Sequence, residues 1–125
     1  MAAPITEEEA LRFIRDQIDS IPHLEALILL SDHPRSWSAS EIADRLYIPD
    51  ERARIVLDDL VERRLLHRKE SCYFFDPDQT LKLMMEAVSL LHRNQLVRVT
   101  ALIHSKASSS VSEFAKAFRF RKGDR

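Results

Sequence analysis

The chain of 125 residues contains one glycine and one cysteine. Scarce glycine favours helices joined by short turns over a sandwich or barrel, and it excludes the glycine-rich loops that cradle phosphates. The single Cys72 excludes an internal disulfide. The five histidines are scattered along the chain without the spacing of a metal site. We therefore expect no catalytic residues, no metal and no cofactor.

No apolar stretch continues uninterrupted over the length that a membrane span needs. Residues 81–103 are rich in apolar side chains, but charged or polar residues interrupt them at Lys82, Glu86, His92, Arg93 and Arg98. The first residues lead directly into an acidic helix, which predicts no signal peptide. A chain of this length buries a core without disulfides or metals, so we expect one cytoplasmic domain that does not contact a membrane.

Charge is distributed unevenly along the chain. Residues 1–33 carry seven acidic and two basic side chains, a net of −5, and residues 34–91 carry eleven acidic and nine basic, a net of −2. Residues 92–125 carry eight basic and two acidic side chains, a net of +6. Binding to nucleic acid gains from the release of counterions at phosphates, so we expect the strongest electrostatic contribution from the last third of the chain.

Two helices are predicted near the N-terminus. Thr6 and Glu9 have the spacing of a capping box, and apolar residues at helical spacing follow, which predicts a helix over residues 7–19. Ser20 precedes a second helical stretch over residues 23–30. This stretch is apolar on most sides, so we expect its helix to lie at the centre of the fold.

A short helix, a turn and a second helix are predicted after residue 36. Ser38 and Glu41 form another capping box at the start of the short helix, and Tyr47-Ile48-Pro49 ends it. Asp50 is expected to cap the second helix. Its buried face is predicted from apolar residues at helical spacing, which are Ala53, Val56, Leu57, Leu60 and Val61.

Two strands complete the pattern. They are predicted over residues 65–69 and 72–75, with a turn at Glu70-Ser71 between them and a stop at Asp76-Pro77. Trp37 is expected as an anchor of the core, since large aromatic side chains bury the most surface. The order of helix, turn, helix and two-stranded wing is that of a winged helix-turn-helix.

These motifs resemble the winged helix-turn-helix transcriptional regulators, most nearly the multiple-antibiotic-resistance regulator (MarR) type. The shared motifs lie in residues 22–78 and are W-S-x-x-E-I-A-x-x-L, an I-P turn, A-x-x-x-L-x-x-L and an L-L strand start. The resemblance implies a mainly α fold with a two-stranded β-wing, flanked by N- and C-terminal helices within residues 1–104, and it implies DNA binding. At Arg64 such domains often have a left-handed glycine, so we expect this helix to end differently.

A long apolar helix is predicted from about Thr80. It has more apolar surface than one face of a domain covers, and two explanations remain open. Either the helix packs on the winged module and on a second copy, or it breaks near residue 94 and folds back. In MarR-type proteins the flanking helices form the dimer interface, so the resemblance implies a homodimer. The expected interface residues are Leu81, Met85, Val88 and Leu91.

In a DNA-binding winged helix, the outer face of the second helix enters the major groove. The expected DNA contacts are basic residues of this helix and of the wing, namely Arg52, Arg54, Arg63, Arg64, Arg68 and Lys69. The same face carries acids that phosphates repel, with Ile55 among them. This favours an alternative function, a protein-protein interaction module of a regulatory adaptor. It docks through this helix and through the basic C-terminal segment, and the expected docking residues are Glu51, Ile55, Asp58, Asp59, Glu62, Phe114 and Phe118.

The last residues suggest a tethered peptide. A serine-rich linker is predicted over residues 105–112, followed by a basic amphipathic segment over residues 113–125 with Phe114 and Phe118 on one side. This segment either docks back on the same molecule or its dimer mate, or it binds a protein partner or a nucleic-acid backbone. Cys72 is either an inert packing residue or a thiol sensor, as in some MarR-type regulators.

Overall fold

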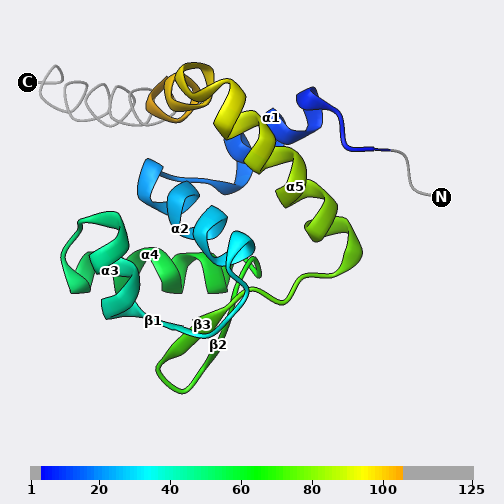
Figure 1. The fold of residues 1–125 in the computed structure, drawn as a ribbon. Coiled ribbons are helices and arrows are strands. Elements are labelled where there is room, and N and C mark those ends of the chain that lie inside the picture. The colour runs from blue at the N-terminus through cyan, green and yellow to red at the C-terminus, as the bar shows by residue number, and fades with distance from the viewer. Residues whose placement is uncertain (1–3, 106–125) are drawn as a thin grey trace, which may run out of the picture.

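The computed structural model describes residues 4–105, and its fold class is the predicted one, mainly helical with a small β-sheet (Figure 1). A further helix spans residues 96–105. Within the described part of the chain, no helix has both the length and the apolar character to cross a bilayer. Residues 106–125, with Phe114 and Phe118, lie outside this part. The other elements are α1 (Glu7–Gln17), α2 (Ile21–Asp32), β1 (Trp37–Ser38), α3 (Ala39–Leu46), α4 (Asp50–Glu62), β2 (His67–Lys69), β3 (Cys72–Phe74) and α5 (Gln79–Asn94).

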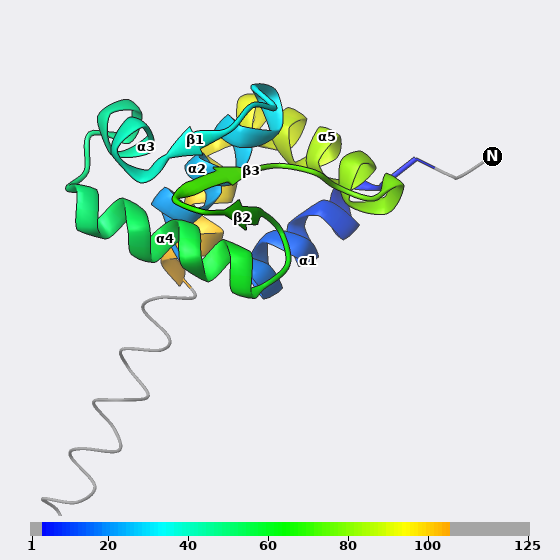
Figure 2. The same ribbon diagram turned by 90° about the horizontal axis from the view of Figure 1, so that it is seen from below.

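Helix α2 is the centre of the fold, as its apolar sequence predicts. It contacts α3, α4 and α5, and Leu24, Leu27 and Leu30 are fully buried. In Figure 1, α1 and α5 pack against each other above α2, while α3, α4 and the strands lie below it. Figure 2 views the molecule from below and shows α3 and α4 beside the three strands. The winged helix-turn-helix therefore packs below a helical layer that both ends of the described chain form.

The capping boxes predicted at two helix starts are confirmed. The hydroxyls of Thr6 and Ser38 accept the backbone N–H of Glu9 and Glu41, and each glutamate accepts the N–H of its cap residue. Hydrogen bonding from the Ser38 backbone, with help from Arg35, lowers the pKa of Glu41. These reciprocal bonds satisfy donors that an isolated helix leaves open, which explains why the helices begin where the sequence predicts.

The turn between α3 and α4 differs from its prediction in one respect. Pro49, and not Asp50, is the N-cap of α4, and it offers no side-chain hydrogen bond. Asp50 is the first helical residue, and its negative charge interacts favourably with the positive end of the helix dipole. Tyr47 ends α3 in the left-handed region (φ 57°, ψ 46°), and the N–H of Ile48 donates to the carbonyl of Ala43 at 3.1 Å.

Helix α4 ends in the usual left-handed way, so the expectation of a different ending at Arg64 is wrong. Arg64 has φ 63°. Its N–H donates to Val61 O at 2.9 Å, and the N–H of Leu65 donates to Leu60 O, also at 2.9 Å. These two bonds make a Schellman motif, and the buried Leu60 and Leu65 belong to one hydrophobic core. Core packing after the helix holds Arg64 in the left-handed conformation, which is unfavourable for residues other than glycine.

The sheet contains one more strand than the predicted two-stranded wing. Strand β3 pairs with β2 and also with β1, all antiparallel, in the order β1-β3-β2. Trp37 on β1 stands opposite Tyr73, and Arg68 on β2 stands opposite Tyr73 from the other side. Trp37 is buried, which confirms it as a core residue, and its indole N–H donates to His33 O at 3.0 Å.

Helix α5 ends at Asn94, which confirms the alternative of a break near residue 94. Gln95 leaves the helical region (φ −135°, ψ 50°), and residues 96–105 form a new helix. Val99 and Ile103 of this helix are buried, and Arg98 forms an ion pair with Glu7 of α1. The helix over residues 96–105 therefore covers α1.

Three of the predicted dimer-interface residues lie inside the single chain. Met85, Val88 and Leu91 are buried in its own hydrophobic core, and Leu81 is half-buried against that core. The break after α5 and the packing of α1 and α2 supply the cover that the sequence led us to expect from a second copy. The exposed apolar residues of this region are instead Leu90, Leu96 and Val97.

Candidate nucleic-acid interface

The exposed side of α4 presents two arginines, as predicted. Ala53 and Val56 are fully buried, so the helical repeat turns Arg52 and Arg54 toward solvent. Within residues 4–105, neither arginine forms an ion pair. Two cations near the start of α4 are therefore available to an external anion.

Asp58 of α4 is tied to the wing, the hairpin formed by β2, β3 and their connecting turn. It accepts the hydroxyl of Tyr73 at 2.6 Å and a guanidinium N–H of Arg68 at 3.3 Å. The Arg68 guanidinium also lies 5.6 Å from the centre of the Tyr73 ring. Burial of Tyr73 and its hydrogen bond to Asp58 raise the pKa of this phenol to about 12. The carboxylate thus positions the wing against α4.

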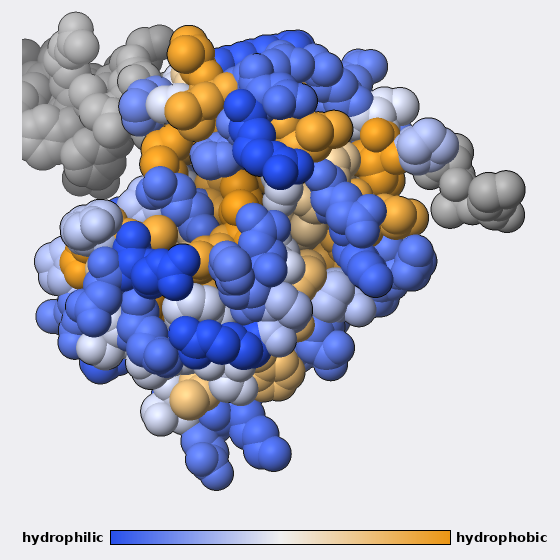
Figure 3. Space-filling model, viewed as in Figure 1, coloured by the Kyte–Doolittle hydropathy of each residue, from blue (hydrophilic) through white to orange (hydrophobic). Residues whose placement is uncertain are grey.

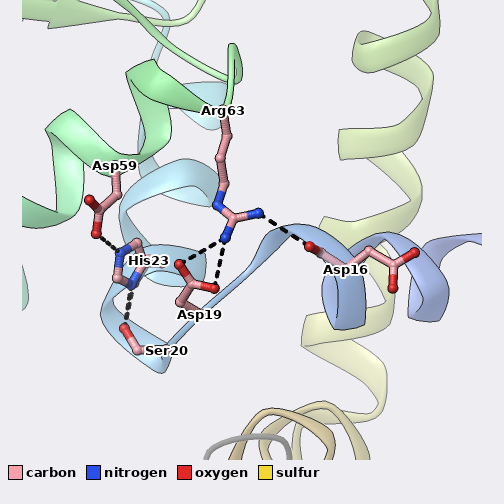
Figure 4. Close-up of polar contacts among 6 residues, drawn as sticks. All are labelled: Asp16, Asp19, Ser20, His23, Asp59 and Arg63. Carbon is pink, nitrogen blue, oxygen red and sulfur yellow. Dashed lines mark hydrogen bonds and ion pairs between the residues drawn. The ribbon is translucent and has the colours of Figure 1, made fainter. Parts of the chain in front are cut away.

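Asp59 is turned to the other side of α4, toward the beginning of α2. Its carboxylate lies 2.8 Å from Nε2 of His23, a buried residue whose Nδ1 contacts the hydroxyl of Ser20. Figure 4 shows the imidazole between Asp59 and Ser20. Asp58 and Asp59 are both half-buried, so they do not form one exposed acidic face as the helical projection predicts.

Arg63 is engaged within the molecule. Its guanidinium donates to both carboxylate oxygens of Asp19, at 3.0 and 3.1 Å, and to the carbonyl of Asp16 at 3.2 Å (Figure 4). This contact ties the end of α4 to the connection between α1 and α2. Arg64 is exposed and borders a cavity together with Phe13. The sequence predicts Arg63 as a DNA contact, but its partners in the structure lie 44 and 47 residues away in the chain.

The wing presents one exposed cation and one paired cation. Lys69 is exposed and forms no ion pair within the described residues, whereas Arg68 is shared between Asp58 and the carbonyl of Glu70. Glu70 has φ 59° and allows the tight reversal between the strands. His67 stacks on Phe74 with ring centres 5.4 Å apart, which fixes the base of the hairpin.

The predicted docking patch is smaller than expected. Ile55 is 49% exposed, and Glu51 and Glu62 are exposed near the two ends of α4. Asp58 and Asp59 contribute to other contacts, as described above. What remains is one half-exposed isoleucine without a continuous ring of acids.

Two further arginines were not identified from the sequence. The guanidinium of Arg35 stacks 3.5 Å from the centre of the Trp37 ring, and that of Arg45 lies 5.5 Å from the same centre. Arg35 also pairs with Glu41. Both arginines are exposed although the indole is buried, so they hold positive charge at the beginning and end of α3. The R-x-W spacing before α3 is a sequence signal from which the first of them could have been identified.

Comparison with known proteins supports the fold. No protein-family model matches the chain, and no curated protein matches it. Among solved structures it is similar to a MarR family protein of Mycobacterium tuberculosis, at 14% identity and a TM-score of 0.50. The match covers 93% of this chain and 79% of that chain. At this identity the likeness shows the fold alone, and this chain has a MarR-like winged-helix fold.

Proposed function

We propose that this protein is a DNA-binding transcriptional regulator that inserts α4 into the major groove and places the wing on the phosphate backbone. The observation that carries the proposal is the pair of exposed arginines, Arg52 and Arg54, without ion-pair partners in residues 4–105. They lie on the helix that reads bases in DNA-binding proteins of this fold. Lys69 adds an exposed cation on the wing.

The acids of α4 oppose this function less than their number in the sequence suggests. Asp58 is neutralised by Arg68 and accepts from Tyr73, and Asp59 faces His23. Asp50, Glu51 and Glu62 remain, the first two in the first turn of the helix and the third at its far end. A phosphate near the middle of α4 therefore meets less negative charge than the sequence alone implies.

The salt dependence of binding to a random-sequence DNA duplex tests this function. Each cation that neutralises a phosphate contributes about 0.9 to the slope of log affinity against log salt. We expect a slope that reports several such contacts, measured by fluorescence anisotropy on the full chain. A dissociation constant weaker than about 100 µM at moderate salt, the weak limit of non-specific binding, contradicts the proposal. Protein docking at Ile55 is then the function to test next.

We also propose that the regulator is a homodimer. Leu90, Leu96 and Val97 are apolar, and between 52% and 83% of each is exposed. Figure 3 shows hydrophobic surface at the top of the molecule, where the residues after α5 lie. An apolar surface on the terminal helices fits the interface that the MarR resemblance implies, although its residues differ from the predicted ones.

A further inference from the structure

Three metal-ligating side chains meet where the connection between α1 and α2 contacts α4. One ligand atom each from Asp19, His23 and Asp59 lies within 4.8 Å of the other two. His23 is buried, and its Nε2 points at the carboxylate of Asp59, while Ser20 holds Nδ1 from the opposite side (Figure 4). In a metal-ligating histidine the second ring nitrogen is usually held by a hydrogen bond, as Nδ1 of His23 is by Ser20, so Nε2 is the nitrogen that can bind an ion.

A cavity adjoins this cluster and carries an excess of negative charge. Its volume is about 340 Å³, and it is lined by Asp19, Asp59, Glu62 and Arg63. Three carboxylates face one guanidinium there, so the lining is negative overall at neutral pH. Glu62 stands three residues after Asp59 on α4 and therefore on the same side of the helix. The space and the charge both favour a cation beside His23.

We propose that Asp19, His23 and Asp59 bind one divalent transition-metal ion. A nitrogen ligand with carboxylate oxygens suits Zn²⁺ and similar ions, whereas Mg²⁺ and Ca²⁺ prefer oxygen ligands alone. The ion replaces the hydrogen bond between His23 and Asp59, and water or Glu62 completes its coordination. This site is independent of DNA binding, because none of its ligands belongs to the proposed DNA contacts.

The present contacts allow this exchange through small movements. Ligand atoms around a tetrahedral Zn²⁺ lie about 3.3 Å apart, which follows from bond lengths near 2.0 Å. The side chains of Asp19 and Asp59 are each 40% exposed and therefore have room to rotate toward the imidazole. Arg63 now donates to both oxygens of Asp19 and is itself 35% exposed, so its guanidinium can leave for solvent. Arg63 and the metal thus compete for Asp19.

Calorimetric titration of the full chain with Zn²⁺ tests the site, in a Cys72→Ser background that removes the thiol as a ligand. After treatment with a chelator, we expect one ion per chain. His23→Gln and Asp59→Asn should each weaken binding at least about tenfold, the smallest effect expected for losing even an outer-sphere partner. His104→Gln, which removes an exposed histidine outside the cluster, should leave the affinity unchanged. Equal affinity of the His23→Gln and His104→Gln proteins overturns the proposal, as does the absence of Zn²⁺ binding.

Arg63→Gln gives a test of opposite sign. It removes the competing guanidinium, so Zn²⁺ binding should tighten even though the chain loses contacts to Asp19 and Asp16. A cluster with only a structural role predicts lower thermal stability and no gain in affinity, and that result contradicts the site. Thermal melts in chelator identify any variant that fails to fold. Co²⁺ added to the Cys72→Ser protein supplies a second readout, since its visible bands should be present there and lost in Asp59→Asn.

Discussion

The hydroxyl of Tyr73 donates to the carboxylate of Asp58 at 2.6 Å and joins the central strand of the sheet to α4. The tyrosine is buried, and Arg68 approaches the same carboxylate from β2 at 3.3 Å. A helix that inserts into a groove requires a fixed orientation relative to its wing. One carboxylate supplies that connection here, and the same interaction lowers the effective negative charge of α4.

Stability at high pH should depend on this bond. The pKa of Tyr73 is raised to about 12 in the folded chain, against about 10 for a free tyrosine, so the unfolded chain loses the proton first. The contribution is therefore complete below pH 10 and is lost as the pH rises through 12. Urea unfolding between pH 9 and 12 should show a steeper loss of stability in the wild type than in Tyr73→Phe. Parallel curves for the two proteins would contradict this assignment.

Arg64→Gly should stabilise the protein. Arg64 occupies the left-handed position of the motif that ends α4, which costs an L-residue roughly 1–2 kcal/mol. Glycine adopts this conformation without that cost but has more freedom in the unfolded chain, so we expect a net gain of about 0.5–1 kcal/mol. Chemical denaturation measures it. Arg63→Gly is the matched control and should destabilise, because Arg63 has negative φ and bonds Asp19.

Removing the two exposed cations of α4 should weaken DNA binding. In Arg52→Ala/Arg54→Ala the salt slope should fall by about 1–2, the loss of one or two phosphate contacts. Arg12→Ala/Arg15→Ala on α1 changes the net charge equally at exposed positions away from α4, and it should leave the slope nearly unchanged. Equal losses in the two double variants would mean that binding responds to net charge alone and not to α4.

Local signals predicted the elements well, and contacts distant in sequence decided the site. Capping boxes and apolar spacing identify α1 and α3 because both signals lie within one helix turn. Strand β1 has only two residues and forms by pairing with β3. No alternation of apolar and polar residues therefore predicts it from the sequence. Asp58 and Asp59 look alike in the sequence, yet one faces Tyr73 and the other His23. Only the fold shows which charges are paired.

The proposed dimer should depend on the exposed apolar residues after α5. Leu96→Glu/Val97→Glu should reduce the mass measured by light scattering from twice 14.5 kDa to one chain, with the helical content unchanged. Val88→Glu places a charge in the core and should instead unfold the protein. Lys82→Glu, an exposed change on α5, is the control and should preserve the dimer. A wild-type protein that is monomeric at high micromolar concentration excludes this assembly.

Asp58→Asn should strengthen DNA binding, which connects the contact between Tyr73 and Asp58 to the proposed function. The asparagine oxygen still accepts from Tyr73, but the substitution removes one negative charge from α4 and releases Arg68 from its ion pair. Phosphates then gain a freed cation, and we expect about 0.2–1 kcal/mol of added affinity, the range of an exposed ion pair. The part of the gain that comes from Arg68 should disappear when Arg68→Ala is combined with Asp58→Asn. Weaker binding by Asp58→Asn would mean that the carboxylate serves DNA binding mainly by orienting the wing.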